Sequence, residues 1–259
     1  MSQLQWLDAD NLRFPPTHSA LRDPDGLLAV GGDLSPARLI ESYSHGIFPW
    51  YSDGQPLLWW TPDPRMVLRP AHVHRGRTLR KLLRQHPFTI TVDSAFDAVA
   101  QACGTIEREG QDGTWITQEM LAAYSELNRL GVAHSLEVWL QNELVGGLYG
   151  IALGTVFFGE SMFSRVSGAS KVGFSILCQQ LENWGFELVD CQIHSGYLAS
   201  FGAQEIPRAT FEKLLAQHVW NTPRVPSAAC YQSPIPTTSR PCPPLINWQM
   251  AWTAGEDLA

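Results

Sequence analysis

The strongest constraint on the fold is a β-rich block that is followed by one helix and one further strand. Apolar segments at 133–140, 144–152 and 155–164 are separated only by short turns, as is typical of neighbouring strands. A helix is then expected at 169–184, ended by Gly185, and another strand at 186–192. Strands that alternate with capped helices indicate an α/β (α+β) protein with a mixed sheet.

Shorter elements surround this block. Ser35 is expected to cap a helix that has Pro36 in its first position and ends at Gly46. Other helices are expected at 78–85, 94–103, 117–130 and 210–219, with strands at 57–61 and 88–92. Prolines interrupt any helical or strand periodicity between Thr222 and Pro244, so the segment 237–259 is expected to be a disordered tail.

Charge is unevenly distributed along the chain. The formal net charge is −7, yet residues 64–92 contain seven cations and no carboxylate: Arg65, Arg69, Arg75, Arg77, Arg80, Lys81 and Arg84. Spacings of three and four place the last four on one face of the helix expected at 78–85. Such segregation predicts a local surface for a polyanion, with nucleic acid as the first candidate. The alternative is a solvated helix face near acids from elsewhere in the fold.

The composition argues against several classes of protein. The N-terminus has neither a basic region nor an apolar core of the kind found in signal peptides, and no apolar run is long enough to cross a bilayer. The five cysteines form no CxxC pair and are typical of reduced cytosolic thiols. His72 and His74 are more typical of exposed imidazoles than of a metal site. We therefore expect a cytoplasmic protein that needs neither a metal nor a cofactor.

The strand expected at 186–192 carries two polar residues of catalytic interest. Because side chains alternate along a strand, Asp190 and Gln192 should share one face, while Cys191 points to the other. A carboxylate and a carboxamide at a strand end can orient a nucleophile and stabilise developing charge. Cys191 is more typical of buried packing than of a nucleophile. The alternative is that Asp190 merely caps a neighbouring turn.

The strand expected at 155–164 places a carboxylate among apolar groups. Strict alternation puts Glu160 on one face with Val156, Phe158, Met162 and Ser164. A buried acid is unfavourable without a partner, so a cleft that accepts both an apolar and a cationic ligand would explain the pattern. A core glutamate paired with an internal Arg or Lys is the competing explanation.

The segment RVSGAS (165–170) lies between this strand and the following helix. It approximates the glycine loop with which GNAT-type acyltransferases hold a pyrophosphate at a helix N-terminus, although Ser170 replaces the last small residue. Glycine motifs this short are weak indicators by themselves.

Several runs together resemble one known family over residues 4–235. They are PDGLLAVGGDLSPARLIESYSHGIFPWY (24–51), LLWWTPDPR (57–65), DGTWIT (112–117), AHSLEVW (133–139), ELVGGLYG (143–150), FGESMFS (158–164), and DCQ with LASFGAQEIPR (190–208). The set is similar to the leucyl/phenylalanyl-tRNA–protein transferases, bacterial enzymes that add an apolar residue to proteins beginning with Arg or Lys. The resemblance implies a small N-terminal domain at 1–66, a GNAT-like acyltransferase domain at 67–236, and a tail at 237–259.

The resemblance also implies roles for individual residues. Trp50 and Trp115 would hold the 3′-terminal adenosine of the tRNA. The pocket for the aminoacyl side chain would comprise Leu148, Met162, Phe174, Leu177 and Val189. Asp190, Gln192 and Glu160 would be catalytic, and the tRNA acceptor stem would bind Arg77, Arg80, Lys81 and Arg84.

Four positions depart from the family pattern or fit it less well. Family members commonly have His where this chain has Tyr197, which weakens any role for an imidazole there. Phe157 matches a pocket position, but alternation puts it opposite Glu160 unless a bulge intervenes. Tyr43 and Tyr124 also match, yet their helical spacing is more typical of core residues.

The implied function is transfer of Leu or Phe, and more weakly Met, from aminoacyl-tRNA to the α-amine of proteins with N-terminal Arg or Lys. This would mark those proteins for N-degron degradation, and the enzyme would act as a monomer. Two alternatives remain open: an acetyl-CoA-dependent GNAT-type acyltransferase, supported by RVSGAS, and a non-catalytic RNA-binding protein, supported by the basic helix.

Overall fold

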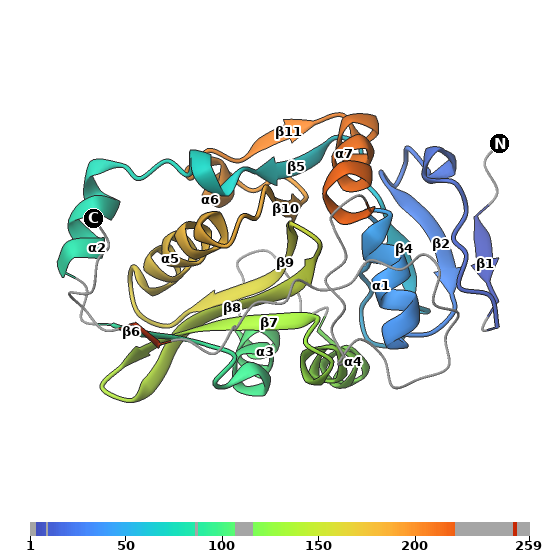
Figure 1. Cartoon of the computed structure of the whole chain (residues 1–259). Coiled ribbons are helices and arrows are strands. Elements are labelled where there is room, and N and C mark those ends of the chain that lie inside the picture. The colour runs from blue at the N-terminus through green and yellow to red at the C-terminus, as the bar shows by residue number, and fades with distance from the viewer. Residues whose placement is uncertain (1–3, 9, 86–87, 107–115, 221–250, 253–259) are drawn as a thin grey trace.

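A computed structural model describes residues 4–8, 10–85, 88–106, 116–220 and 251–252 of the 259-residue chain. Two sheets organise these residues, a small one formed near the N-terminus and a large one that follows it (Figure 1). Within the described residues, no helix has both the length and the apolar character needed to cross a bilayer.

The small sheet has the strand order β1-β2-β4-β3. Its strands are β1 (Gln5–Leu7), β2 (Leu27–Gly31), β3 (Phe48–Pro49) and β4 (Leu58–Trp60), and a 3-10 turn, η1 (Thr17–Ser19), lies between β1 and β2. Helix α1 (Pro36–Ser44) begins where the sequence predicts, because the Ser35 side chain accepts a hydrogen bond from the backbone of Arg38. Leu39, Ile40 and Tyr43 of α1 are buried.

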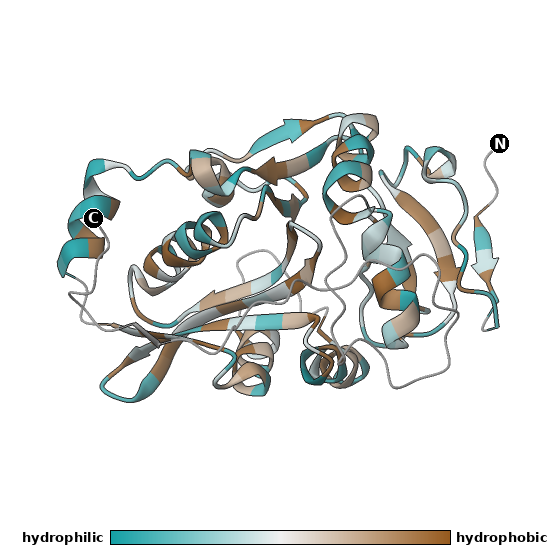
Figure 2. Cartoon of the chain, in the orientation of Figure 1, coloured by the Kyte–Doolittle hydropathy of each residue, from teal (hydrophilic) through white to brown (hydrophobic). Residues whose placement is uncertain are grey.

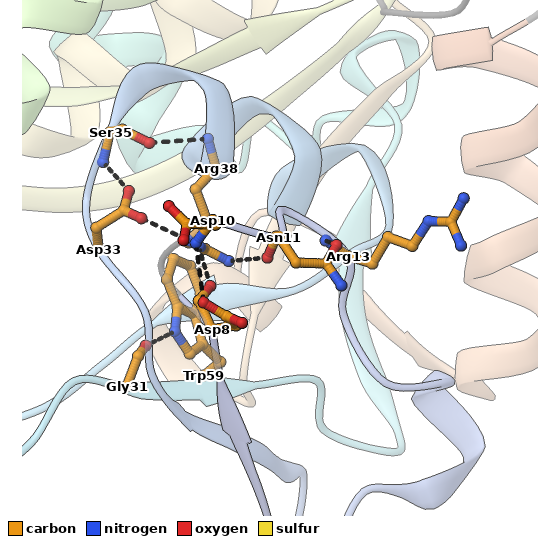
Figure 3. Close-up of polar contacts among 9 residues, drawn as sticks. All are labelled: Asp8, Asp10, Asn11, Arg13, Gly31, Asp33, Ser35, Arg38 and Trp59. Atoms are coloured by element: carbon orange, nitrogen blue, oxygen red, sulfur yellow. Dashed lines mark hydrogen bonds and ion pairs between the residues drawn. The ribbon is translucent and has the colours of Figure 1, made fainter.

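A buried arginine fixes the N-terminal segment to this sheet (Figure 3). The Arg38 side chain is fully buried and donates to the main-chain oxygens of Asp8 and Asn11 at 2.7 and 3.0 Å. Its Nε also donates to the Asp33 carboxylate at 3.0 Å. These bonds compensate a buried guanidinium and tie the segment after β1 to α1.

The large sheet has the order β11-β5-β10-β9-β8-β7-β6-β12. Its strands are β5 (Arg65–Leu68), β6 (Thr89–Val92), β7 (Ala133–Leu140), β8 (Glu143–Leu153), β9 (Val156–Ser164), β10 (Leu188–Gln192), β11 (Gln204–Ile206) and β12 (Ala251–Trp252). β10 runs parallel to β9 and antiparallel to β5, so the sheet is mixed. The predicted α/β class with a mixed sheet is thereby confirmed.

Helices cover both faces of the large sheet (Figure 1). The helices and short turns that accompany it are α2 (Arg77–Gln85), α3 (Phe96–Thr105), α4 (Gln118–Arg129), α5 (Ala169–Asn183), α6 (Gly196–Ala199), α7 (Arg208–Leu215), η2 (Pro70–His72) and η3 (Ala216–Trp220). α3 and α4 pack on one face in a core that continues into the small sheet, and we call this the first core. α5 packs on the other face over the second core, where α2 also contributes Leu79, Leu82 and Leu83 (Figure 2).

The expected domain limits fall at particular structural positions. Strand β5 spans residue 66 and pairs with β10 and β11, so the limit expected there lies inside a strand of the large sheet. The division at 66 stays a prediction. The tail expected at 237–259 lies outside the described residues, except that Ala251–Trp252 pair with β6.

A bulge in β9 overturns one prediction from strand alternation. Tyr149 of β8 pairs with Ser161 and Gly150 pairs with Gly159, so Glu160 is an extra residue in β9. The Cβ atom of an added side chain at Gly150 would lie 2.2 Å from the carbonyl oxygen of Phe158, which requires glycine opposite the bulge. The face predicted to hold Val156, Phe158, Glu160, Met162 and Ser164 is therefore wrong: Val156 and Phe158 lie in the first core, and Met162 packs on the second.

Candidate active site

A cavity of about 470 Å³ lies where β9 and β10 separate. The two strands pair in parallel from Leu188 and Val156 to Asp190 and Phe158, and the cavity is lined by residues that follow on both strands. β3 and the segment after it close another side with Phe48 and Trp50. A separated pair of parallel strands is a place where backbone and side-chain polar groups face an open space, so it suits a ligand site.

Glu160, the residue in the bulge, is the centre of a polar network inside this cavity. Its carboxylate accepts hydrogen bonds from the hydroxyl groups of Tyr43 at 2.7 Å and Tyr124 at 2.8 Å, and from Nε2 of Gln192 at 2.9 Å. Burial raises the pKa of Glu160 to about 7, although the hydrogen bonds from both tyrosines oppose that shift. The alternative of an internal Arg or Lys as its partner is wrong, because its partners are two tyrosines and a carboxamide.

The two tyrosines are core residues with a polar role. Tyr43 and Tyr124 come from α1 and α4, are almost fully buried, and place their hydroxyl groups 2.5 Å apart. Burial, together with the charge of Glu160, raises the pKa of each tyrosine well above its usual value. They therefore remain neutral donors and hold the carboxylate in one position.

Asp190 is bound to a buried arginine. Arg65 donates to both carboxylate oxygens, at 2.8 and 2.6 Å, and both side chains are fully buried. The third guanidinium nitrogen donates to the carbonyl oxygen of Gly46 at 3.0 Å, and the guanidinium carbon lies 4.8 Å from the ring centroids of Phe48 and Phe211. Asp190 thus has a structural partner in the interior, and the prediction that Arg65 belongs to a surface of cations is wrong.

Gln192 is positioned by this ion pair. Its backbone N–H donates to Asp190 Oδ1 at 2.9 Å, and its φ angle of 62° is in the left-handed region. The pairing of β10 with β5 shifts between Asp190 and Gln192, which accompanies this unusual backbone. A non-glycine residue with this conformation is strained and needs support from its surroundings, which here comes from Asp190.

Cys191 lies between these two residues and is not activated. Burial raises the pKa of its thiol well above the usual value, and the neighbouring Asp190 charge acts in the same direction. A thiol with a raised pKa is a poor nucleophile, as predicted. The predicted placement is wrong, because Cys191 is only partly buried and lines the cavity together with Asp190 and Gln192.

Most of the pocket predicted for an apolar side chain is assembled. Leu148, Met162, Phe174 and Val189 line the cavity, whereas Leu177 is buried in the second core and is not among the lining residues. Phe157 lines the cavity as well. Because Glu160 is an extra residue in β9, strict alternation no longer places the Phe157 and Glu160 side chains on opposite faces.

The two predicted adenosine-binding tryptophans have different outcomes. Trp50 lines the cavity and is half-buried, with its carbonyl oxygen accepting a 2.7 Å hydrogen bond from Nε1 of Trp60. Trp115 lies outside the described residues.

The seven cations of the basic segment separate into two groups. Arg65 is internal. Nη1 of Arg69 lies 3.5 Å from Oε2 of the exposed Glu187, and Nε of Arg75 donates to the Ser175 hydroxyl at 3.0 Å. The remaining four are exposed on α2: Arg77, Arg80, Lys81 and Arg84. The predicted cationic helix face is therefore formed by four residues, and the other three have separate roles.

Sequence reasoning missed the importance of Arg65. Strand β5 is buried along its whole length, and Arg65 is its first residue. A single cation at the start of an apolar strand, matched by a single carboxylate in another apolar strand, was the available signal.

Comparisons with known proteins agree with one another. The family model described as leucyl/phenylalanyl-tRNA protein transferase matches residues 67–216, and its N-terminal domain model matches residues 32–63. A protein of Teredinibacter turnerae named leucyl/phenylalanyl-tRNA–protein transferase is 99% identical over 259 residues and covers all of both chains. A protein of the same name from Saccharophagus degradans is 59% identical over 223 residues, which are 86% of this chain and 91% of that one.

The solved structures that match are more distant. A GCN5-related N-acetyltransferase from Kribbella flavida is 12% identical, with a TM-score of 0.34, over 66% of this chain and 60% of that one. The protein described as L-PGS from Bacillus licheniformis is 12% identical, with a TM-score of 0.35, over 60% of this chain and 50% of that one.

Proposed function

The chain belongs to the leucyl/phenylalanyl-tRNA–protein transferase family, and we propose that the cavity between β9 and β10 transfers Leu or Phe from tRNA to the α-amine of a protein. The observation that carries this proposal is one cavity in which an apolar pocket meets Gln192 and Glu160. The apolar pocket suits the aminoacyl side chain, and the polar groups suit the ester and the amine.

The donor binds through its two ends. The Leu or Phe side chain occupies the space among Leu148, Met162, Phe174 and Val189, and the terminal adenosine stacks on Trp50. Stacking on an aromatic side chain contributes about 1–3 kcal/mol per base. An apolar pocket discriminates by only about 1–3 kcal/mol per methylene, so Met is a weaker donor rather than an excluded one.

The reaction needs alignment and charge stabilisation more than activation of the nucleophile. An α-amine has a reference pKa of about 7.7–8.0, so a neutral fraction already exists near pH 7. The amine attacks the ester carbonyl, the C–N bond forms, the bond to the ribose oxygen breaks, and the amine proton leaves with that oxygen. Gln192 contacts the reacting centre, and Asp190 with Arg65 holds Gln192 in place.

Glu160 attracts the cationic N-terminal residue of the acceptor. Among the described residues, Glu160 and Asp190 are the carboxylates that line the cavity, and Asp190 is already paired with Arg65. The hydrogen bonds to Glu160 come from neutral side chains, which leaves its charge available to a ligand. This supports acceptors with N-terminal Arg or Lys.

Finer parts of the proposal follow from the family resemblance. The acceptor proteins are thereby marked for degradation by the N-degron pathway, and the enzyme acts in the cytoplasm as a monomer without a cofactor. The N-terminal part, residues 1–66, and the catalytic part, residues 67–236, act together on one tRNA.

The decisive experiment measures transfer of labelled Leu from Leu-tRNA to a peptide that begins with Arg. We expect labelled peptide, less of it for a peptide that begins with Asp, and little transfer when Glu160 is changed to Gln. Acetylation of the peptide by acetyl-CoA without transfer from tRNA would contradict the proposal, as would binding of tRNA without any transfer.

A further inference from the structure

A second concave surface lies beside the active site, between α2 and the start of α5. It is a groove of about 720 Å³ whose lining includes Arg77 and Lys81 of α2, Lys171 of α5, and His74. No carboxylate lines it among the described residues. In a chain with a net charge of −7, three cations around one groove without an acid form a local site for an anion.

The cations of α2 do not all face this groove. Arg77 and Lys81, which are four residues apart, line it, whereas Arg80 and Arg84 do not. All four are exposed, and none forms an ion pair with another described residue. Residues separated by four lie on one stripe of a helix, so α2 presents two adjacent cationic stripes.

The groove and the catalytic cavity are neighbours. The loop between β9 and α5 contributes Ser164 and Ser170 to the cavity, and Ser167 and Gly168 to the groove. The segment around α6 is shared in the same way, with Tyr197 on the cavity and Ser200 on the groove. The Tyr197 hydroxyl donates to Ser170 Oγ at 3.0 Å, so one hydrogen bond lies between the two spaces.

We propose that this groove binds the phosphates of the single-stranded 3′ end of the tRNA, with Lys171 as the residue that anchors a phosphate next to the active site. The inference rests on the proposed function, because it requires aminoacyl-tRNA as the donor. Arg77 and Lys81 then contact the single strand, while Arg80 and Arg84 contact the adjoining duplex. Lys171 is a positioning residue, since it holds the strand that delivers the ester into the cavity.

Charge and continuity favour RNA as the occupant. The strand enters past Arg77 and Lys81, passes Lys171, and crosses the hydrogen bond between Tyr197 and Ser170 into the cavity that holds Trp50. Phosphate contacts position a nucleic acid without reading its sequence, so the groove requires no specificity for the tRNA body.

The test compares Lys171→Ala and Arg80→Ala with the unchanged enzyme, using two ligands: full-length Leu-tRNA and a single-stranded RNA tetranucleotide that ends in CCA. We expect Lys171→Ala to lower the affinity for both ligands roughly 3- to 10-fold. It should also reduce the slope of log affinity against log salt concentration by about 0.7, the value for one phosphate of a single strand. Arg80→Ala should lower the affinity for full-length tRNA and leave the affinity for the tetranucleotide unchanged. Lys171→Arg should restore both affinities and the slope.

Two controls separate this proposal from its premise. Lys213→Ala removes another exposed cation, on α7, and should change neither affinity nor salt slope. Melting temperatures should be equal among these variants, because each changed side chain is exposed. If the unchanged enzyme transfers Leu but Lys171→Ala keeps the full salt slope, or if the tetranucleotide does not bind, the groove proposal is overturned. If the unchanged enzyme transfers no Leu, the proposed function itself fails.

Discussion

At the scale of single residues, the candidate active site contains two carboxylates with different environments. Asp190 is paired with Arg65 in the interior, and Glu160 receives hydrogen bonds from Tyr43, Tyr124 and Gln192. The charge of Asp190 is already paired with a cation, whereas the partners of Glu160 are neutral, which is why we assign the contact with the acceptor to Glu160. The sequence indicated both acids, but it could not separate their roles because the partners lie 125 and up to 117 positions away.

We expect Asp190→Asn to lower kcat by roughly 100-fold while the KM for Leu-tRNA stays nearly constant. The change removes the charge that pairs with Arg65 and loosens the backbone at Gln192, but it does not touch the surface of α2. Steady-state kinetics with varied Leu-tRNA will measure this split. Weak tRNA binding with a normal kcat would contradict the role given to Asp190.

The same ion pair should matter for stability. Asp190→Ala leaves a buried guanidinium without its partner, which costs about 3–5 kcal/mol. Arg65→Met combined with Asp190→Ala should recover much of that loss, and urea unfolding of both variants will measure it. Because the double variant should be folded, its loss of activity can be assigned to the lost hydrogen bond between Asp190 and the Gln192 backbone rather than to unfolding.

The raised pKa of Glu160 predicts a dependence on pH. The pKa of Glu160 is about 7 in the folded protein and its ordinary value is 4.5, so the protonated form favours the folded state. That contribution to stability is lost as pH rises from about 4.5 to about 7. The melting temperature of the unchanged enzyme should therefore fall across this range relative to Glu160→Gln. Melting curves from pH 4.5 to 8 will test this.

Activity should show the opposite trend with pH. Ionised Glu160 attracts the acceptor, so kcat/KM for an Arg peptide should rise through pH 7 in the unchanged enzyme. In Glu160→Gln this rise should disappear, and only the rise from the α-amine near pH 8 should remain. Identical profiles in both enzymes would exclude the charge of Glu160 as the cause.

At the scale of elements, the bulge in β9 decides which residues meet. Strict alternation places Phe157 opposite Glu160, and the extra residue brings both to one cavity. Helices α1, α4 and α5, by contrast, agree with the sequence-based prediction to within a few residues, because caps and apolar periodicity are local signals. A bulge is decided by the partner strand, so alternation within β9 contained no information about it.

We expect Gly150→Ala to close the bulge or to unfold its surroundings. The added Cβ would collide with the Phe158 carbonyl, and the relaxed register would move Glu160 away from Tyr43 and Tyr124. The expected result is a lower melting temperature and a loss of transfer activity that exceeds any change in tRNA affinity. A matched control is Gly196→Ala, where nothing lies within 4 Å of the added Cβ and the backbone is not in the left-handed region.

At the scale of the whole molecule, the N-terminal sheet and the large sheet share one apolar core. Leu39 and Trp59 from the N-terminal part belong to the same cluster as Phe96 and Tyr149. The sequence predicted the order of the parts through its family resemblance, but not the continuity between them, because the contacts join residues far apart in the chain. The N-terminal part therefore supplies Phe48 and Trp50 to the lining of a cavity formed mainly by the large sheet, and the Tyr43 hydroxyl that donates to Glu160.

We expect Arg38→Met to loosen the N-terminal segment without changing the chemistry. Loss of the guanidinium leaves the carbonyl oxygens of Asp8 and Asn11 without their donor, which should lower the free energy of unfolding by on the order of 2–4 kcal/mol. Limited proteolysis should cut within the first 30 residues sooner, while kcat of the folded enzyme stays unchanged. Arg13→Met is the matched control, because its exposed side chain points away from this cluster (Figure 3).

The bond from Arg65 to the carbonyl oxygen of Gly46 has a consequence for hybrid enzymes. The loop after α1 supplies that oxygen and strand β3 supplies the ring of Phe48, so a foreign N-terminal half would bring its own backbone geometry to the Arg65 guanidinium. Hybrids joined near residue 64 from distant relatives should then be soluble yet slow, with activity returning when residues 46–48 and the segment that begins with Arg65 are inherited from the same parent.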